Sequence, residues 1–212
     1  MPAYLESPIL SAFPWTTHGF GTRSSAPIPD SVSTVKQIHS NLVLLADHPG
    51  LIGEGDALVT GQPGLAVSIR TADCYPILLA DTRNRAVGAI HAGWRGTAAQ
   101  IVIKTLEKMG SEFGTLPNDI SAAIGPGIGV CCYEVGEEVS RQFGFATRTH
   151  LDLVSENRKQ LESAGVPTQK IEALGGCTFC SAERFFSYRR EKEEAGRMTS
   201  FIMLRTEYPA GN

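Results

Sequence analysis

Three short polar segments carry the residue types that suit catalytic chemistry. They are Lys36–His39 (KQIH), Thr71–Cys74 (TADC) and His91–Gly96 (HAGWRG). Cys74 directly precedes an apolar run of strand length, and His91 follows another such run, 17 residues further along the chain. If the two runs form neighbouring antiparallel strands, Cys74 and His91 meet at one edge of a sheet. His39 must then join them from a separate loop.

One cysteine and two histidines match the ligand set of a catalytic zinc ion. Such an ion takes imidazole nitrogen and thiolate sulfur from three protein ligands and keeps its fourth position for water. His39, Cys74 and His91 are therefore candidate metal ligands, although their spacing alone matches no compact zinc signature and a cysteine beside a strand is often a small buried hydrophobic residue. A second hypothesis makes Cys74 the nucleophile of a hydrolase or amidase and His91 its base.

The other four cysteines lie in two pairs, Cys131–Cys132 and Cys177–Cys180. The second pair is a CxxC motif, but the sequence offers no second CxxC to complete a four-cysteine site and no βαβ pattern typical of a redox motif. We therefore predict structural thiols there, and we expect Cys131 and Cys132 to point to opposite sides. An odd total of five cysteines favours reduced thiols over a disulfide framework.

A basic group stands out in a chain with net charge −3. It consists of Ser187–Arg190 (SYRR) with Arg197. Such a group is commonly a solvated helix face, and its functional interpretation is a phosphate clamp, for which arginine has the right geometry.

The elements that must position these residues follow from hydrophobic patterning. Apolar runs predict strands, and amphipathic segments that end at Gly or Pro predict helices. The predicted strands are Asn41–Asp47, Ala57–Thr60, Leu65–Ile69, Pro76–Ala80, Ala86–Ile90, Ile120–Ile124 and Ser200–Leu204. The predicted helices are Thr97–Gly110, Glu134–Phe143 and Leu153–Ala164. The short polar connector Asp81–Arg85 indicates a hairpin between two of the strands.

Composition limits the class of protein. The 212 residues have 42% hydrophobic content and no internal repeat or linker, which indicates one mixed α/β domain over residues 1–212. The acidic balance gives no electrostatic footprint for nucleic acid. No long apolar run or basic leader is visible, so we expect a cytoplasmic protein without a membrane partner.

The motifs KQIHS, GDALVT, TADCYPILLAD, HAGWRGT, IGPGIGVCCYEVGEEV, LDL and FFSYRR resemble, in order and spacing, the YfiH/laccase-domain family of bacterial proteins. The resemblance implies an α/β fold, a single-domain layered sandwich with a mixed sheet, related to the toxin cysteine deamidases. It places the metal ligands on His39, Cys74 and His91, with Asp73 and Arg95 beside them. One departure is Gly127, where the family often has a cysteine.

The resemblance also implies an activity. Members are described as purine nucleoside phosphorylases that also deaminate adenosine, so purine nucleosides and phosphate are the expected partners and zinc the expected cofactor, with copper as the alternative metal. Asp73, Cys74 and Arg95 are the candidate catalytic residues, and Lys36, Arg95 or Arg189 could hold phosphate. An older family label is phenol oxidase. Multicopper oxidases ligate copper mainly with imidazole. Because only five histidines are present, the sequence argues against a laccase-type copper site.

Overall fold

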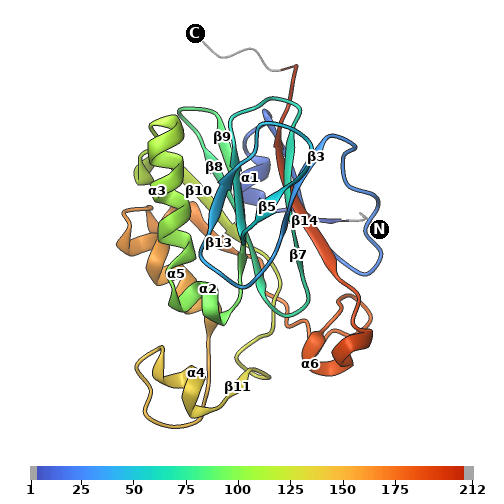
Figure 1. The fold of residues 1–212 in the computed structure, drawn as a ribbon, viewed down its shortest axis with the longest axis vertical. Coiled ribbons are helices and arrows are strands. Elements are labelled where there is room, and N and C mark those ends of the chain that lie inside the picture. The colour runs from blue at the N-terminus through green and yellow to red at the C-terminus, as the bar shows by residue number, and fades with distance from the viewer. Residues whose placement is uncertain (1–3, 208–212) are drawn as a thin grey trace.

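Two β-sheets of six strands each lie against one another in residues 4–207, the part of the chain that the computed structural model describes (Figure 1). In sheet order, the first sheet contains β1 (Tyr4–Leu5), β2 (Thr16–Gly21), β14 (Met198–Leu204), β7 (Ala66–Thr71), β3 (Val32–Lys36) and β5 (Gly50–Glu54). The second contains β13 (Ile171–Ala173), β10 (Ile120–Ile124), β8 (Tyr75–Asp81), β9 (Ala86–Ala92), β6 (Ala57–Thr60) and β4 (Val43–Leu45). Both sheets mix parallel and antiparallel pairs.

The continuous apolar run of β8 reflects its central position, because both of its faces are covered. Leu78 and Ala80 pack into the core between the two sheets, together with Val67 and Ile202 of the first sheet. The alternate side chains of β8, such as Ile77, contribute to a second core on the opposite face. A strand that is buried on both faces has no polar alternation, which explains the unbroken apolar run from Pro76 to Ala80.

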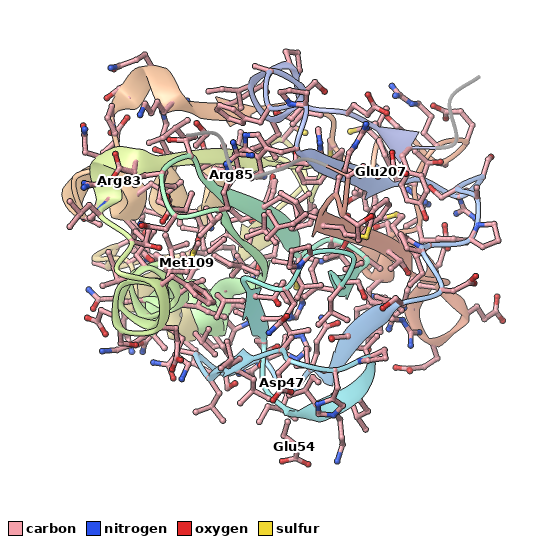
Figure 2. The ribbon with its side chains drawn as sticks, turned by 90° about the horizontal axis from the view of Figure 1, so that it is seen from above. Asp47, Glu54, Arg83, Arg85, Met109 and Glu207 are labelled. Atoms are coloured by element: carbon pink, nitrogen blue, oxygen red, sulfur yellow. The ribbon has the colours of Figure 1, made fainter. Side chains whose placement is uncertain are left out.

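Helices between residues 94 and 163 cover the outer face of the second sheet, whereas the helix Pro8–Ser11 packs Leu10 into the core between the sheets (Figure 1). The described helices are α1 (Pro8–Ser11), α2 (Trp94–Ala98), α3 (Ile101–Phe113), α4 (Glu137–Arg141), α5 (Leu153–Ser163) and α6 (Tyr188–Glu191). Met109 lies on the side of α3 that faces the sheet, whereas Asp47 and Glu54 lie at the periphery (Figure 2). The result is a layered arrangement of sheet, sheet and helices. None of the described helices is both long and apolar enough to cross a membrane.

The hairpin that matters for the site is confirmed. Strands β8 and β9 pair antiparallel with Tyr75 opposite Ala92 and Pro76 opposite His91. The predicted helix Leu153–Ala164 is confirmed as α5, which begins with the Asp152 side chain accepting a hydrogen bond from the backbone N–H of Ser155.

Two predicted helices differ in the structure. The segment Glu134–Phe143 is not one helix, because Glu134–Val135 forms a short strand, β11, paired with β12 (Thr149–His150), and only Glu137–Arg141 is helical. Gly136 separates the two elements in an extended conformation. The helix predicted from Thr97 is two helices, since Gln100 adopts a left-handed conformation with φ of 61° between α2 and α3.

Candidate active site

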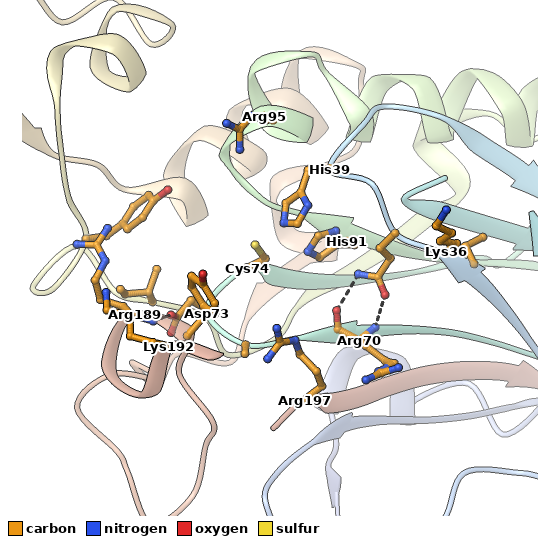
Figure 3. A pocket seen from close by; sticks show the side chains of 16 residues that line it. Lys36, His39, Arg70, Asp73, Cys74, His91, Arg95, Arg189, Lys192 and Arg197 are labelled. Carbon is orange, nitrogen blue, oxygen red and sulfur yellow. Dashed lines mark hydrogen bonds between the residues drawn. The ribbon is translucent and has the colours of Figure 1, made fainter. Parts of the chain in front are cut away.

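The structure brings His39, Cys74 and His91, here called the triad, to one point (Figure 3). Cys74 lies one residue before β8, and His91 lies near the end of the adjacent strand β9. His39 arrives from the loop after β3, where its backbone is left-handed with φ of 58°. One possible ligand atom from each residue lies within 4.8 Å of the others.

Asp56 holds two members of the triad in place through hydrogen bonds. Its fully buried carboxylate accepts a hydrogen bond from Nδ1 of His91 at 2.8 Å and another from the backbone N–H of His39 at 3.0 Å. The backbone N–H and the hydroxyl of Ser40 also donate to it, at 2.6 and 2.7 Å. Because Nδ1 of His91 faces Asp56, Nε2 is the nitrogen left for the site, which is the orienting arrangement common behind metal-binding histidines.

Gly93 is needed because backbone and side chains approach closely at the triad. A Cβ atom at this position would lie 2.9 Å from Sγ of Cys74 and 3.4 Å from Cδ2 of His39. Any larger residue would therefore displace the sulfur or the imidazole ring.

The electrostatics of the triad favour a thiolate. Burial alone would raise the pKa of the Cys74 thiol, but the neighbouring imidazoles of His91 and His39 outweigh it and lower the pKa to about 6. Burial acts to lower the pKa of His91, yet Cys74 and Asp56 together raise it to about 9. These shifts describe a Cys74 thiolate beside a His91 imidazolium. Once the Nε2 proton of His91 is released, one thiolate and two imidazole nitrogens remain, which is the donor set that zinc and other soft or borderline metals bind.

The triad opens into a cavity of about 780 Å³, within the usual range for small-molecule sites. Its walls are strongly cationic although the chain as a whole is acidic. The basic residues that line it are Lys36, Arg70, Arg95, Arg189, Lys192 and Arg197. Asp73 is the single carboxylate among the described residues of the lining. Such a surplus of positive charge favours an anionic ligand.

Arg95 and Lys36 differ in what they already contact. The Arg95 guanidinium stacks over the ring of Trp94 at 4.3 Å and forms no ion pair within residues 4–207. Lys36 is an exposed residue whose ammonium pairs with Glu54 at 2.7 Å. Arg95 is consequently the freer cation for a bound anion, and it lines the same cavity as His39 and Cys74, above them in the view of Figure 3.

Asp73 and Arg189 contact one another through the backbone. The Asp73 carboxylate accepts a hydrogen bond from the Arg189 N–H at 2.6 Å and one from the Thr178 hydroxyl at 2.7 Å. The Arg189 side chain donates to the Glu134 carbonyl at 3.1 Å and lies over the Tyr133 ring at 5.4 Å. Asp73 has φ of 88°, an uncommon conformation that places its carboxylate between these donors.

Several residues of the site were not singled out from the sequence. Asp56, which lies behind the triad and not in the cavity lining, belongs to GDALVT, where a carboxylate directly before a strand was the available signal. Tyr133 lies in the Gly-rich motif, and Arg70 is the last residue but one of β7. Arg197 belongs to the basic group already noted, but Arg190 of that group does not line the pocket. Its guanidinium instead donates to backbone carbonyl groups and pairs with Glu191.

The interpretation that CTFC lacks a partner for a four-cysteine site is wrong. Cys131 and Cys132 supply the second pair, and the sulfur atoms of all four residues lie within 4.8 Å of one another. The two adjacent cysteines therefore do not point to opposite sides. Gly129 gives room for this close approach, since a Cβ atom there would lie 3.2 Å from both Sγ of Cys131 and Cβ of Cys177. Its N–H donates to Sγ of Cys177 at 3.2 Å.

The departure at Gly127 has a steric explanation. A Cβ atom there would lie 2.6 Å from the ring of Tyr75. Tyr75 in turn donates its hydroxyl hydrogen bond to the Ile128 carbonyl at 2.7 Å. The loop therefore packs too tightly against Tyr75 to hold a side chain at position 127.

Comparison with known proteins places this geometry in a family. The family model described as "Multi-copper polyphenol oxidoreductase laccase" matches residues 22–205. The chain is 45% identical to a purine nucleoside phosphorylase of Deinococcus radiodurans over 82% of this chain and 71% of that protein. It is 38% identical to adenosine deaminase RL5, from an unknown prokaryotic organism, over 67% of this chain and 59% of that protein.

A solved structure agrees with the fold. The crystal structure of YlmD from Geobacillus stearothermophilus superposes with a TM-score of 0.87 at 25% identity, covering 97% of this chain and all of that one (100%). The match spans almost the whole molecule, including both sheets. The chain therefore belongs to the multi-copper polyphenol oxidoreductase laccase family, the family of YfiH and YlmD.

Proposed function

We propose that this chain is a zinc-dependent purine nucleoside phosphorylase that also deaminates adenosine. The observation that carries the proposal is the meeting of the triad, a set of cationic side chains and one carboxylate in a single cavity of about 780 Å³. Relatives named purine nucleoside phosphorylase and adenosine deaminase support the same two reactions.

The triad fits a zinc ion. Two imidazoles and one thiolate form an open set of three ligands, and Asp56 orients His91 through Nδ1 at 2.8 Å. When bound, zinc would supply Lewis-acid polarisation of a substrate atom and would acidify a water molecule. The same donors accept copper, so copper is the alternative metal.

In phosphorolysis, the bond between ribose C1′ and the purine nitrogen breaks and a bond from C1′ to a phosphate oxygen forms. The phosphate must be held near the sugar, which is the role we assign to Arg95, assisted by Arg189. Their guanidinium groups suit bidentate contacts to phosphate oxygens. Lys36 is the third candidate, and its pairing with Glu54 leaves it less available.

In deamination, water replaces the amino group at purine C6 and ammonia leaves. A carboxyl group must accept and return a proton, and Asp73 is the one carboxylate among the described residues that line the cavity. Each of its oxygens accepts one hydrogen bond and has a lone pair for another. We therefore assign the proton transfer to Asp73. Cys74 takes part in catalysis as a ligand of the metal ion.

A cysteine hydrolase or amidase is the second candidate, and one observation favours it. Asp56, His91 and Cys74 lie in the order of a carboxylate, an imidazole and a nucleophile. A phenol oxidase is disfavoured, because only His39 and His91 of the five histidines reach the cavity described within residues 4–207.

Metal removal and restoration separates the first two candidates. A metalloenzyme loses turnover of adenosine on dialysis against a chelator and regains it with one equivalent of zinc at the triad. A cysteine hydrolase keeps its activity without metal and loses it on alkylation of Cys74. Retained nucleoside turnover in protein whose zinc content is verified as nil therefore contradicts the proposal.

Three further proposals accompany this function. The packing of both sheets and the helices through shared cores supports one domain over residues 1–212. The strand-end cysteine and histidine support a relation to toxin cysteine deamidases. We further propose a cytoplasmic enzyme that binds neither nucleic acid nor membrane. The acidic net charge of −3 supports the part of this proposal that concerns nucleic acid.

A further inference from the structure

Four cysteines converge outside the substrate cavity. The sulfur atoms of Cys131, Cys132, Cys177 and Cys180 all lie within 4.8 Å of one another. The sulfur of Cys180 lies 3.9 Å from that of Cys131 and 3.3 Å from that of Cys132. We call these four residues the cysteine cluster.

Backbone hydrogen bonds bring the two pairs together across 45 positions of sequence. Gly127 and Cys177 form an isolated parallel bridge, and the Thr178 N–H donates to the Gly127 carbonyl at 2.9 Å. The N–H groups of Cys132 and Tyr133 both donate to the Gly129 carbonyl, at 2.9 and 3.0 Å. This tight turn presents both adjacent cysteines to the CxxC segment.

The sulfur separations, two of 3.3 and 3.9 Å and the others within 4.8 Å, are compatible with a single tetrahedral ion. Zinc–sulfur bonds of about 2.3 Å place the sulfurs of a four-thiolate site roughly 3.8 Å apart. The measured separations of 3.3 and 3.9 Å lie on either side of that value. Iron–sulfur clusters also use four cysteines, but they hold several metal ions and so need more space between the thiolates.

Backbone and side-chain donors surround the cysteine cluster. The Gly129 N–H donates to Sγ of Cys177 at 3.2 Å. The Arg190 guanidinium lies beside the CxxC turn and donates to the carbonyls of Thr178 and Phe179 at 2.7 and 2.6 Å. A cation and N–H donors next to thiolates are typical of a metal site's surroundings.

We propose that the cysteine cluster binds a second, structural zinc ion, separate from the one at the triad. Four protein ligands close the coordination sphere, which is the mark of a structural rather than a catalytic zinc site. Binding replaces the thiol protons, which are released to solvent, so no oxidant or reductant is required. Cys131 and Cys180 are exposed, which gives the ion a path from solvent.

The ion would fasten one wall of the substrate cavity. Thr178, between the two cysteines of the CxxC motif, donates to the Asp73 carboxylate at 2.7 Å. The Ile128 N–H, on the segment that leads to Cys131 and Cys132, donates to the Asp73 carbonyl at 2.8 Å. Ile128, Asp73 and Tyr133 all line the cavity. The cysteine cluster therefore positions this wall without touching the substrate.

Metal counting tests the proposal on the full chain. Protein purified in a reducing buffer without chelator, and analysed by elemental mass spectrometry, should hold two zinc ions per chain. Cys180→Ser should lower the count to one, and Cys74→Ser should also lower it to one by emptying the triad instead. Ser181→Ala is the matched control beside Cys180 and should keep two ions. A loss at the triad thus leaves the cluster's ion in place, so the two zinc proposals can fail separately.

Cobalt replacement identifies the ligands. With cobalt in place of zinc, a four-thiolate site gives strong sulfur-to-metal charge-transfer absorption, which should persist in Cys74→Ser and fade in Cys180→Ser. If Cys180→Ser fails to fold, titration of the wild-type protein with an organomercurial reagent should still release two zinc ions.

Three results would overturn the proposal. The first is a single zinc ion in wild-type protein that Cys74→Ser alone removes. The second is iron in place of zinc at the cluster. The third is a titration of denatured, unreduced and metal-chelated protein that finds one free thiol in place of the five that the sequence provides, because the cluster would then hold two disulfides.

Discussion

The Asp56 carboxylate joins the two histidines of the triad, accepting hydrogen bonds from Nδ1 of His91 at 2.8 Å and from the His39 backbone N–H at 3.0 Å. The two histidines come from different segments, the β3 loop and strand β9. Asp56 is fully buried, and its carboxylate also accepts hydrogen bonds from the backbone N–H and the hydroxyl of Ser40. Burial acts to raise the pKa of Asp56, but His91 and Ser40 hold it at about 2.

Asp56→Asn should weaken metal binding at the triad. The amide NH2 group, itself a donor, would face N–H donors where a carboxylate oxygen now accepts, either from His91 and His39 or from Ser40. The hold of Asp56 on the two histidines is therefore weakened. We expect zinc affinity at the triad to fall about 10- to 100-fold and stability to fall by about 1–3 kcal/mol. Competition with a chromogenic chelator and urea unfolding measure the two effects. Asp47→Asn, at an exposed carboxylate 2.6 Å from Nδ1 of His48, is the control. Equal affinities in both variants would contradict the positioning role.

Gly93→Ala should disturb the triad and leave the fold intact. The added Cβ lies 2.9 Å from Sγ of Cys74. We expect reduced zinc occupancy at the triad and a matching loss of turnover, with the circular dichroism spectrum unchanged. Gly136→Ala is a close control, because Gly136 also precedes a five-residue helix, has nearly the same backbone angles and has open space around it. Full zinc occupancy in Gly93→Ala would show that the close approach is unimportant.

Arg95→Ala should harm phosphorolysis more than deamination. Only phosphorolysis needs a bound phosphate, and the Arg95 guanidinium has no ion-pair partner in residues 4–207. Loss of one charge-assisted contact costs about 1.5–3 kcal/mol, or roughly ten- to a hundredfold in rate. Arg85→Ala, which removes another arginine stacked on a tryptophan, is the control. Equal losses in both reactions would transfer the phosphate role to Arg189 or Lys36.

Asp73→Asn separates proton transfer from positioning. An asparagine can keep both contacts of Asp73 by accepting from the Arg189 N–H and donating to the Thr178 hydroxyl oxygen. We expect deamination to fall by about 10²- to 10⁴-fold with zinc content and stability retained. Steady-state rates with adenosine measure this. If deamination stays near the wild-type rate, Asp73 acts only as a positioning residue.

His18 should make stability depend on pH. Burial lowers its pKa in the folded state, against the opposing charges of Glu6 and Glu172, and its Nε2 accepts a hydrogen bond from the Ser7 N–H at 2.9 Å. The unfolded chain binds a proton at the ordinary pKa of about 6.5, whereas the folded chain resists it. The contribution of His18 is therefore complete above about pH 6.5 and decreases as the pH falls below that value.

His18→Gln should reduce this dependence, since the amide oxygen can accept the Ser7 hydrogen bond without titrating. Urea unfolding between about pH 7.5 and about pH 5.5 should show a smaller loss of stability in the variant than in wild type. His48→Gln controls for the loss of one exposed histidine. Identical pH slopes in wild type and His18→Gln would contradict the assignment.

Local patterns in the sequence predict the hairpin and much of the core. The apolar runs of β8 and β9 and the short connector between them are local features, and the amphipathic pattern of α5 is equally local. The strands β2 and β3 were missed because their mixed, small and polar residues resemble a loop. The helix predicted from Glu134 was wrong at its start, because pairing with β12, a tertiary contact, determines the structure of that segment.

The candidate site also combines residues that local patterns position with residues that long-range contacts position. The positions of Cys74 and His91 follow from the hairpin, but the arrival of His39 depends on Asp56, a buried contact 17 residues away in sequence. The cysteine cluster depends on one bridge between Gly127 and Cys177. Long-range contacts of this kind leave no periodic signal. His39 was therefore identified from its residue type and from the motif KQIHS, whereas neither the role of Asp56 nor the cysteine cluster was predicted.

The most direct test of the central claim is phosphate-dependent cleavage of inosine by zinc-loaded protein. We predict that hypoxanthine and ribose 1-phosphate form in equal amounts, and that neither forms when phosphate is omitted or when Cys74 is replaced by Ala. Release of hypoxanthine at the same rate without phosphate, or no release with zinc bound at the triad, would contradict the account.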